Sequence, residues 1–220
     1  MEADRLAALI PAAGGGVRLG RGPKAFVSLA GRPLLAWSVE ALRPFVAEIV
    51  IAVPDADVER TAALVPAARV VAGADTRQAT VERLLLATER PVVLVHDAAR
   101  PFIDAAVITA VTAALETARA LSVVMPVADS LIDARDGSSV DRSLLRAVQT
   151  PQAFERTLLL EAHAAARADG VSATDDAALV RRLGVHVALV EGGAHLMKVT
   201  TPADLRLAEA YARSLLVEAR

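Results

Sequence analysis

The residues best suited to chemistry begin near the amino terminus, in a glycine-rich stretch followed by cations. Residues 11–20 read PAAGGGVRLG, and Pro23 and Lys24 follow shortly after. Small residues at the carboxyl end of a strand let backbone N–H groups approach phosphate oxygens closely. Arg18 and Lys24 can add positive charge to the same anion. The pattern predicts a loop that binds a polyphosphate.

Two common nucleotide-binding motifs do not fit this stretch. A dinucleotide fingerprint that starts at Gly14 needs a glycine where the chain has Leu19. A Walker A loop ends in Gly-Lys-Ser or Gly-Lys-Thr, whereas Gly20 leads into Arg21 and Gly22. What remains is the pattern G-x-G-x-R-x-G-x-x-P-K. The spacing therefore disfavours a nicotinamide oxidoreductase and a P-loop enzyme.

A second candidate group follows an apolar run, in the segment VHDAARPF at 95–102. Asp97 comes directly after the predicted strand, and a carboxylate there suits Mg²⁺ bound to nucleotide phosphates, because that ion takes oxygen ligands and few protein groups. Arg100 can balance a substrate phosphate. We expect His96 to pack beneath the site rather than act as a base. The plainer structural interpretation is that Asp97 caps the following turn.

Three further segments carry weaker signals. Residues 73–81 (GADTRQATV) predict a turn and a helix start, whose polar end can meet a base, a ribose or an anion. Asp141-Arg142 and the segment QTPQ at 149–152 supply an arginine and a hydroxyl. Thr174 begins the triplet TDD, which is typical of a helix N-cap with acidic residues in its first turn.

Lysine is used very sparingly. Of the 24 lysine and arginine residues, only Lys24 and Lys198 are lysines. A compact ammonium differs from a planar guanidinium in how it meets an anion, so retaining lysine at those positions favours a specific role. Lys198 lies in the segment MKVTTPADL, just before a capping box that begins at Thr201 with proline at the first helical position.

The elements that must position these residues alternate along the chain. Continuous apolar runs predict strands buried on both faces, and the stretches between them predict helices. The predicted strands are Leu6–Ala12, Glu48–Val53, Arg69–Val71, Pro91–His96, Ser122–Val127, Val185–Glu191 and Leu196–Val199. The predicted helices are Pro33–Arg43, Asp55–Val65, Gln78–Thr88, Asp104–Arg119, Glu155–Ala168 and Pro202–Leu216. Such alternation predicts an α/β fold with a Rossmann-like, doubly wound, mostly parallel sheet.

One segment interrupts this rhythm. Residues 128–148 are polar, with a turn signal at Asp136-Gly137 between two β-compatible arms. A lone hairpin is marginally stable in water, so it should pack on something, and a second copy of the chain is the simplest candidate. We therefore expect one domain over residues 1–220, with 128–148 as a protruding β-hairpin arm for dimerisation.

Composition excludes several classes of protein. A formal net charge of −2 disfavours broad nucleic-acid binding, and the absence of cysteine excludes disulfides and thiolate metal sites. No segment approaches the roughly 20 apolar residues that span a bilayer, and the start of the chain does not read as a secretory signal. The expected location is the cytoplasm, with no membrane or nucleic acid as partner.

Taken together, the segments resemble the 2-C-methyl-D-erythritol 4-phosphate cytidylyltransferase family. The most specific parts are PAAGGGVRLG…PK, VHDAARPF, QTPQAF and MKVTTPADL, in that order, and the resemblance runs from about Leu6 to Tyr211. It implies a Rossmann-like sheet with a β-arm that clasps a second subunit. It also implies that CMP is transferred from CTP to methylerythritol phosphate, with release of pyrophosphate and with Mg²⁺ or another hard divalent cation.

The resemblance assigns roles to individual residues. Arg18, Lys24 and Lys198 would be catalytic, and Asp97 would serve both the metal and the substrate. Residues that would bind CTP are Pro11, Ala12, Ala13, Gly14, Gly15, Gly16, Ala74, Asp75 and Thr80. Residues that would bind the second substrate are Asp97, Arg100, Thr174 and Lys198 of the same subunit, with Arg142 and Thr150 reaching into the partner's site.

The chain departs from the family pattern at a few positions, and other functions stay open. Ala74 and Thr80 stand where the family usually has glycine and serine, Asp176 ends the TDE-like triplet, and Leu145 replaces an expected tryptophan. A cytidylyltransferase for another polyol phosphate, such as ribitol 5-phosphate, shares the same fold. A non-catalytic nucleotide-binding subunit would require loss of a phosphate-facing group, and none of the predicted groups is missing.

Overall fold

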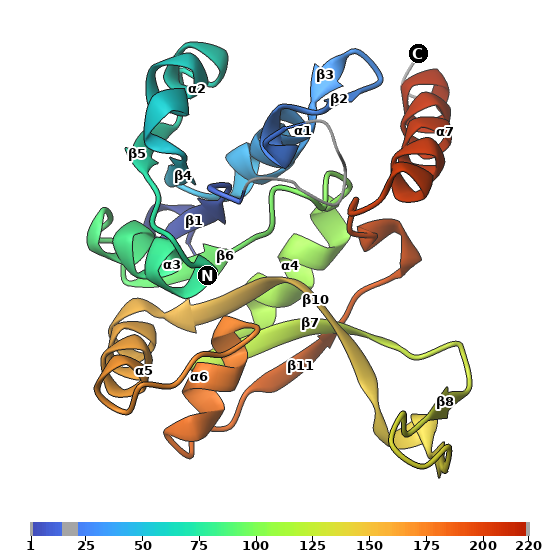
Figure 1. Cartoon of the computed structure of the whole chain (residues 1–220). Coiled ribbons are helices and arrows are strands. Elements are labelled where there is room, and N and C mark those ends of the chain that lie inside the picture. Colours follow the sequence, from blue (N-terminus) through green and yellow to red (C-terminus); the bar gives the residue numbers. More distant parts are fainter. Residues whose placement is uncertain (1, 15–21, 219–220) are drawn as a thin grey trace.

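The computed structural model describes residues 2–14 and 22–218 of the chain. Within that part, seven strands form one sheet in the order β11-β7-β10-β6-β1-β4-β5 (Figure 1). The strands of this sheet are β1 (Leu6–Pro11), β4 (Glu48–Val53), β5 (Arg69–Ala72), β6 (Val92–Val95), β7 (Ala120–Pro126), β10 (Arg146–Glu155) and β11 (Ala188–Glu191). The predicted α/β sheet is thus confirmed.

Most neighbouring strands in the sheet are parallel. β1 pairs in parallel with β4 and β6, β4 with β5, and β7 with β11. β10 is the exception, because it runs antiparallel between β6 and β7. The chain leaves β1 toward β4 on one side, while β6 lies on the other side. A change of direction of this kind opens a crevice at the carboxyl ends of the strands.

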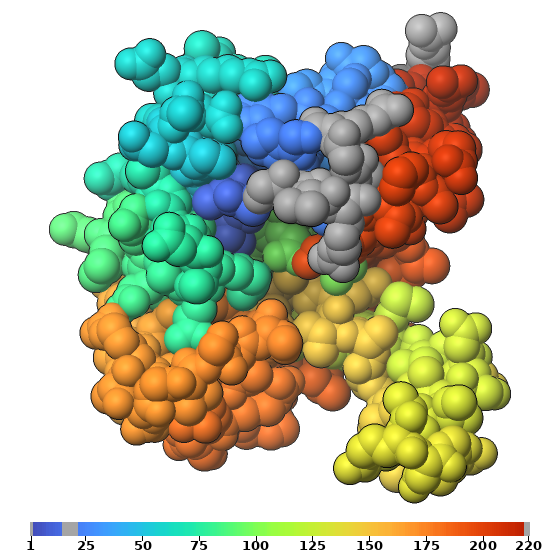
Figure 2. Space-filling model, viewed as in Figure 1, coloured from blue at the N-terminus to red at the C-terminus, as the bar shows by residue number. Residues whose placement is uncertain are grey.

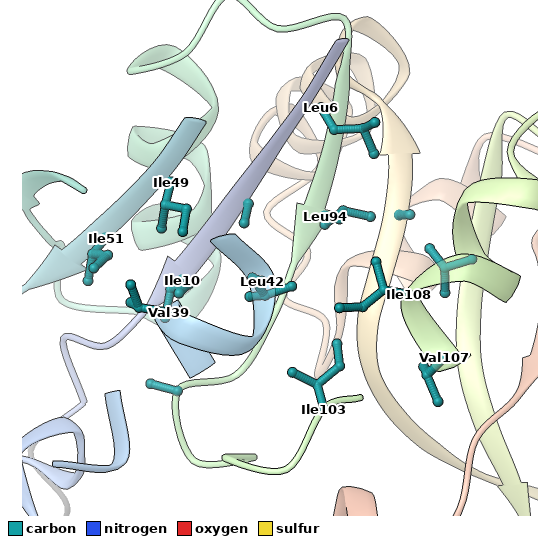
Figure 3. Close-up of a cluster of buried hydrophobic side chains, with 14 of the residues drawn as sticks. Leu6, Ile10, Val39, Leu42, Ile49, Ile51, Leu94, Ile103, Val107 and Ile108 are labelled. Atoms are coloured by element: carbon teal, nitrogen blue, oxygen red, sulfur yellow. The ribbon is translucent and has the colours of Figure 1, made fainter. Parts of the chain in front are cut away.

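Both faces of the sheet are covered by helices. Leu6, Ala8 and Ile10 of β1 point to one face and Ala7 and Leu9 to the other, and all are buried. Figure 3 shows the first of these clusters, which contains side chains of β1, α1 and α4. The helices are α1 (Leu34–Leu42), α2 (Val58–Leu64), α3 (Arg77–Leu86), α4 (Ala105–Ala114), α5 (Arg156–Ala168), α6 (Asp176–Arg182) and α7 (Pro202–Glu218).

The carboxyl-terminal helix packs apart from the main sheet. α7 lies against a small hairpin of β2 (Ser28–Leu29) and β3 (Arg32–Pro33), around a third apolar cluster that includes Phe102. The predicted capping box is confirmed, since Thr201 N–H donates to Asp204 Oδ2 at 2.8 Å and Asp204 N–H donates to Thr201 Oγ1 at 3.2 Å. No helix in the described ranges, the 17-residue α7 included, is long and apolar enough to cross a bilayer.

The predicted hairpin arm is present. β8 (Leu131–Ile132) and β9 (Ser139–Val140) pair antiparallel, and Gly137 has a positive φ of 74° in the turn between them. A positive φ is readily adopted by glycine, which explains the turn at Asp136-Gly137. Figures 1 and 2 show the arm standing away from the body of the chain, and Figure 1 shows it between the end of β7 and the start of β10.

In the carboxyl-terminal half, one predicted strand was wrong and one observed strand was missed. Leu196–Val199 is not a strand; a short 3₁₀ helix (Ala194–Leu196) leads into an extended segment outside the sheet. Conversely, β10 was not predicted, because its central residues include glutamines and a proline that do not read as a buried strand. Gln149 and Gln152 are nevertheless buried there, and each is hydrogen-bonded through its side-chain amide.

Candidate active site

A cavity of about 400 Å³ opens at the carboxyl ends of β1, β5 and β6. In open α/β sheets this edge is where ligands bind. Its lining comes from segments far apart in sequence, namely Pro11, Ala12, Ala13, Gly14, Lys24, Ala25, Ala74, Asp75, Thr76, Arg77, Thr80, Asp97, Ala98, Ala99 and Lys198. A larger depression of about 770 Å³, lined by Glu2, Arg5 and Pro91 among others, lies at the opposite edge, where β6 begins. The 400 Å³ cavity is therefore the candidate site.

Asp97 is the central charge of this cavity. Its Oδ2 lies 2.6 Å from Lys198 Nζ and 3.9 Å from Arg100 Nε, and its Oδ1 lies 3.7 Å from Arg77 Nε. Burial by itself would raise the pKa of the Asp97 carboxyl. The attraction of Lys198, Arg77 and Arg100 outweighs burial and lowers this pKa to about 2. Asp97 is thus an ionised carboxylate surrounded by cations at neutral pH.

Lys198 is brought to Asp97 by backbone contacts on both sides of it. Val199 N–H donates to the Ala99 carbonyl at 2.8 Å, which ties the Lys198 segment to the loop after β6. On the other side, Arg100 Nη1 donates to the Leu196 carbonyl at 2.6 Å. The capping box of α7 then holds the chain that follows. These contacts explain why the segment leaves the sheet instead of continuing as a strand.

Arg100 serves this framework more than the cavity. Its Nη1 bonds the Leu196 carbonyl, and its Nη2 donates to the Val148 carbonyl at 3.2 Å, at the base of the arm. Burial lowers the pKa of the Arg100 guanidinium, although nearby Asp97 acts in the opposite direction. Only Nε faces Asp97, and the cavity lining includes Ala98 and Ala99 rather than Arg100.

His96 lies beneath the site, as predicted, and is fully buried. Its Nε2 lies 3.0 Å from the Arg100 carbonyl, which can only accept, so Nε2 carries the hydrogen. Its Nδ1 then accepts from the Thr150 hydroxyl at 3.1 Å, and that hydroxyl accepts from Asp97 N–H at 3.1 Å. Burial is the largest cause that lowers the pKa of His96, to about 4. A neutral imidazole with both nitrogens engaged supports the loop and is not placed to act as a base.

The turn after β5 is shaped by Thr80. Its hydroxyl oxygen accepts from Ala74 N–H at 3.0 Å and lies 2.8 Å from the Thr76 carbonyl, to which it can donate. The neighbouring Gly73 packs closely against Ala13 in the loop after β1. A Cβ added to Gly73 would lie 2.4 Å from the Cβ of Ala13. This close approach requires glycine and brings the two loops together along one wall of the cavity.

Arg77 is a site residue that the sequence analysis did not single out. It is the first residue of α3, lines the cavity, and lies between Asp97 and Asp176, with its Nη1 2.8 Å from Asp176 Oδ2. A signal was available, because a cation at a helix amino terminus opposes the helix dipole and so indicates a nearby acidic partner. The two carboxylates outweigh burial and raise the pKa of Arg77.

The predicted site residues divide into three groups. Those that line the cavity are Pro11, Ala12, Ala13, Gly14, Lys24, Ala74, Asp75, Thr80, Asp97 and Lys198. Those that lie elsewhere are Arg100 and Thr150, which are buried beside it, and Thr174 and Arg142, which are exposed outside its lining. Gly15, Gly16 and Arg18 fall outside the described residues.

Thr150 differs most from the predicted role of reaching into a partner's site. Its hydroxyl is committed within this chain to Asp97 and His96, so the side chain does not project outward. Arg142 does lie in the arm, where its guanidinium donates to the Ala128 carbonyl. Of the two, only Arg142 is on the part of the chain that extends away from the body.

Known proteins share this sequence and fold. A family model described as IspD, 2-C-methyl-D-erythritol 4-phosphate cytidylyltransferase, matches residues 6–214. The cytidylyltransferase of that name from Deinococcus radiodurans is 58% identical over 212 residues, covering 95% of this chain and 90% of the relative. The Thermus thermophilus protein is 50% identical over 208 residues, covering 93% and 96%. A crystal structure of the Thermus thermophilus enzyme has a TM-score of 0.86 at 46% identity, covering 97% of this chain and 100% of that one.

These matches agree with the segments that converge on the cavity. The family model spans the first loop, Asp97 and Lys198 alike, and the structural match extends over nearly the whole chain. Sequence and fold thus point to the same family for all the segments that line the cavity. The chain therefore belongs to the 2-C-methyl-D-erythritol 4-phosphate cytidylyltransferase family and is a cytidylyltransferase enzyme.

Proposed function

We propose that the 400 Å³ cavity binds CTP and methylerythritol phosphate side by side, and that this chain joins them as the family name describes. The observation that carries the proposal is the convergence of residues 11–14, Lys24, Asp97 and Lys198 on one cavity. In the reaction, an oxygen of the methylerythritol phosphate attacks the α-phosphorus of CTP. The new P–O bond forms as the bond to the β-phosphate breaks, and pyrophosphate leaves with the electron pair.

This reaction needs charge stabilisation more than proton transfer. The nucleophile is already an anion, so no base has to remove a proton from it, in keeping with a neutral, buried His96. Negative charge grows on the phosphate oxygens and on the leaving pyrophosphate, which fixed cations stabilise. We assign this role to Lys24 and Lys198, together with Arg18, which lies outside the described residues.

CTP is assigned to the side of the cavity formed by the loops after β1 and β5. The small side chains of Ala12, Ala13 and Gly14 leave room for phosphates to approach the backbone. Ala74 and Asp75 are assigned to the base and ribose. Thr80 supports them indirectly, because its hydroxyl is already bonded within the turn.

Methylerythritol phosphate is assigned to the side formed by Asp97 and Lys198. Their 2.6 Å ion pair offers a carboxylate for substrate hydroxyls and an ammonium for the phosphate. Arg100 holds the segments that carry them, through its bonds to Leu196 and Val148. Thr174 is exposed just ahead of α6, outside the cavity lining, and is kept as a candidate contact.

We infer that a divalent cation in this cavity takes its ligands from the nucleotide phosphates and not from Asp97. Both Asp97 oxygens already face cations, and a further positive ion bonded directly to this carboxylate would meet their repulsion. Among the described residues no three His, Cys, Asp or Glu side chains gather as a metal site. We therefore propose that Mg²⁺ or another hard divalent cation enters on the triphosphate of CTP, where it would neutralise phosphate charge. This revises the predicted Asp97–metal bond.

We also propose a homodimer formed through the arm. Leu144 of the arm is 81% exposed, the highest value among the large apolar side chains of the described residues, and Ile132 of the same arm is 66% exposed. Packing on a second copy would bury them and would carry Arg142 toward the partner's cavity. We place the enzyme in the cytoplasm, where nucleoside triphosphates are available.

The first test is pyrophosphate release from CTP and Mg²⁺, with methylerythritol phosphate and ribitol 5-phosphate supplied separately. We expect release with methylerythritol phosphate, a loss of at least roughly 100-fold in Lys24→Ala, and wild-type rates in the control Arg182→Ala. Arg182 carries the same charge but pairs with Asp169 on the surface, away from the cavity. Release with ribitol 5-phosphate alone would overturn the substrate assignment, and CTP binding without release would overturn the catalytic one.

A further inference from the structure

Arg77 joins the active site to a buried pair of side chains behind it. Its Nε faces Asp97 Oδ1 at 3.7 Å, and its Nη1 lies 2.8 Å from Asp176 Oδ2. Asp176 is the first residue of α6, and Arg77 is the first residue of α3. One guanidinium thus spans two carboxylates that belong to different parts of the fold, only one of which lines the cavity.

Asp176 is held firmly in place. Only 1% of its side chain is exposed. Its Oδ1 accepts a hydrogen bond at 3.2 Å from Nε2 of His163, which belongs to α5 and is equally buried. Its own N–H donates to the Gln152 side chain at 3.1 Å, which anchors the start of α6 to β10. A buried carboxylate needs a countercharge, and Arg77 supplies one. Asp176 and His163 therefore form a fixed anchor for the Arg77 guanidinium.

The two oxygens of Asp97 face different cations. Lys198 Nζ and, at a longer distance, Arg100 Nε face Oδ2, whereas only Arg77 Nε faces Oδ1 among the ion pairs of the described residues. A carboxylate contacted from only one side can rotate about its last bond, and an ion pair with Lys198 would rotate with it. Contact on the second side restricts that rotation. The direction in which Lys198 presents its ammonium thus depends on Arg77, at the start of α3.

We propose that Arg77, anchored by Asp176 and His163, is a positioning residue that orients Asp97 and Lys198 for the second substrate. It acts through these two residues and leaves CTP binding largely to the loops after β1 and β5. The inference rests on the proposed assignment of Asp97 and Lys198 to methylerythritol phosphate. A purely structural link between α3 and α6 is the competing explanation for the same contacts.

Arg77→Lys separates the two explanations. A lysine still supplies positive charge to Asp176, so a structural link would be largely restored. A single ammonium, however, cannot face both Asp176 and Asp97 as a planar guanidinium does. We expect Arg77→Lys to retain the wild-type Tm within a few degrees while the KM for methylerythritol phosphate rises about tenfold or more, with the KM for CTP changed less than about twofold.

Two further variants and one control complete the test on the full-length enzyme. Arg77→Gln should raise the KM for methylerythritol phosphate at least as much as Arg77→Lys does. Asp176→Asn should also raise this KM, because it retains Arg77 but removes the carboxylate that anchors it. As a control, Arg182→Gln removes the exposed ion pair between Arg182 of α6 and Asp169 at the end of α5, and it should match wild type in both KM values. If Asp176→Asn fails to fold, Arg77→Lys still decides the question.

The possible outcomes are distinct. An equal rise of both KM values, or a lower Tm with unchanged kinetics, would overturn the positioning role. Full kinetic rescue by Arg77→Lys would do the same. Failure of the wild-type enzyme to release pyrophosphate would instead overturn the proposed function, so the two failures cannot be confused.

Discussion

Lys198 Nζ lies 2.6 Å from Asp97 Oδ2, although the two residues are 101 positions apart in the chain. The contact depends on Val199 N–H reaching the Ala99 carbonyl and on Arg100 holding the Leu196 carbonyl. Both residues face the cavity, and Lys198 is the more exposed of the two. The pair is thus accessible to a bound substrate while its backbone is fixed from behind.

Replacing Lys198 should impair catalysis without unfolding the enzyme. Lys198→Met retains the length of the side chain and removes its charge, and Asp97 would still face Arg77 and Arg100. We expect kcat/KM for methylerythritol phosphate to fall by roughly 100-fold, because a fixed cation near the reacting phosphate is lost. Steady-state pyrophosphate release measures this effect. A Lys198→Met enzyme with unchanged kcat/KM would contradict the assignment of Lys198.

Asp97→Asn distinguishes a substrate contact from a metal ligand. Asparagine lacks the charge that pairs with the cations around Asp97. We therefore expect the substitution to raise the KM for methylerythritol phosphate by about tenfold or more. The Mg²⁺ concentration that gives half-maximal rate at saturating CTP should stay within about twofold of wild type, because the triphosphate holds the ion. Titration of Mg²⁺ at fixed CTP compares the variant with wild type. A large increase in the Mg²⁺ requirement would show that Asp97 binds the metal after all.

His96 should make folding stability depend on pH in a defined window. Its pKa is lowered from 6.5 to about 4 in the folded chain, so between these values the unfolded chain binds a proton that the folded chain does not. The stabilisation that the neutral, buried His96 gives the folded chain is complete above pH 6.5 and is lost as the pH falls toward 4. We expect about 2 kcal/mol of unfolding free energy to be lost from this source between pH 7 and pH 5.

The matched variant for this prediction is His96→Gln, whose amide can also donate to the Arg100 carbonyl and accept from Thr150. Urea unfolding at pH 7 and pH 5 should show a smaller loss in the variant than in wild type. The comparison does not depend on the absolute stability of either protein. Asp97 does not interfere, since its pKa of about 2 places its own effect below pH 4. Equal losses in the two proteins would exclude His96 as the source.

A methyl group at Gly73 should weaken CTP binding, and a second substitution should restore it. The Cβ of Gly73→Ala would lie 2.4 Å from the Cβ of Ala13, so the two loops must separate. We expect a rise of about tenfold in the KM for CTP. Adding Ala13→Gly removes the clash and should return the KM to within about threefold of wild type. Absence of rescue in the double variant would mean that Gly73 acts by another route.

Charges placed on the arm should disrupt the proposed dimer. Leu144 and Ile132 are large, apolar and exposed, so Leu144→Asp combined with Ile132→Asp should give a monomer in light scattering at micromolar concentration. Activity should fall with it, because Arg142 would no longer reach a partner. Leu207→Asp is the matched control, since Leu207 is 64% exposed on α7, outside the arm. A monomeric wild-type enzyme with full activity would overturn the proposal.

Much of the fold follows from patterns that are local in sequence. The apolar run of β4 and the capping box of α7 were predicted at their observed places, because burial on both faces and cap chemistry depend on neighbouring residues. Asp136-Gly137 likewise predicted the turn of the arm. β10 was missed because the burial of Gln152 depends on Ser122 and the start of α6, which are remote in sequence.

The sequence by itself determined which groups were available for the chemistry: a glycine-rich loop, Lys24, Asp97 and Lys198, each marked by residue type and by its place after a strand or before a cap. Only the tertiary structure decided how they are used. The Thr150 hydroxyl accepts from the Asp97 N–H, and Arg77, which also pairs with the buried Asp176, faces the Asp97 carboxylate directly. These roles depend on hydrogen bonds and ion pairs between distant segments, and a side chain's partner across the fold leaves no periodicity in the chain.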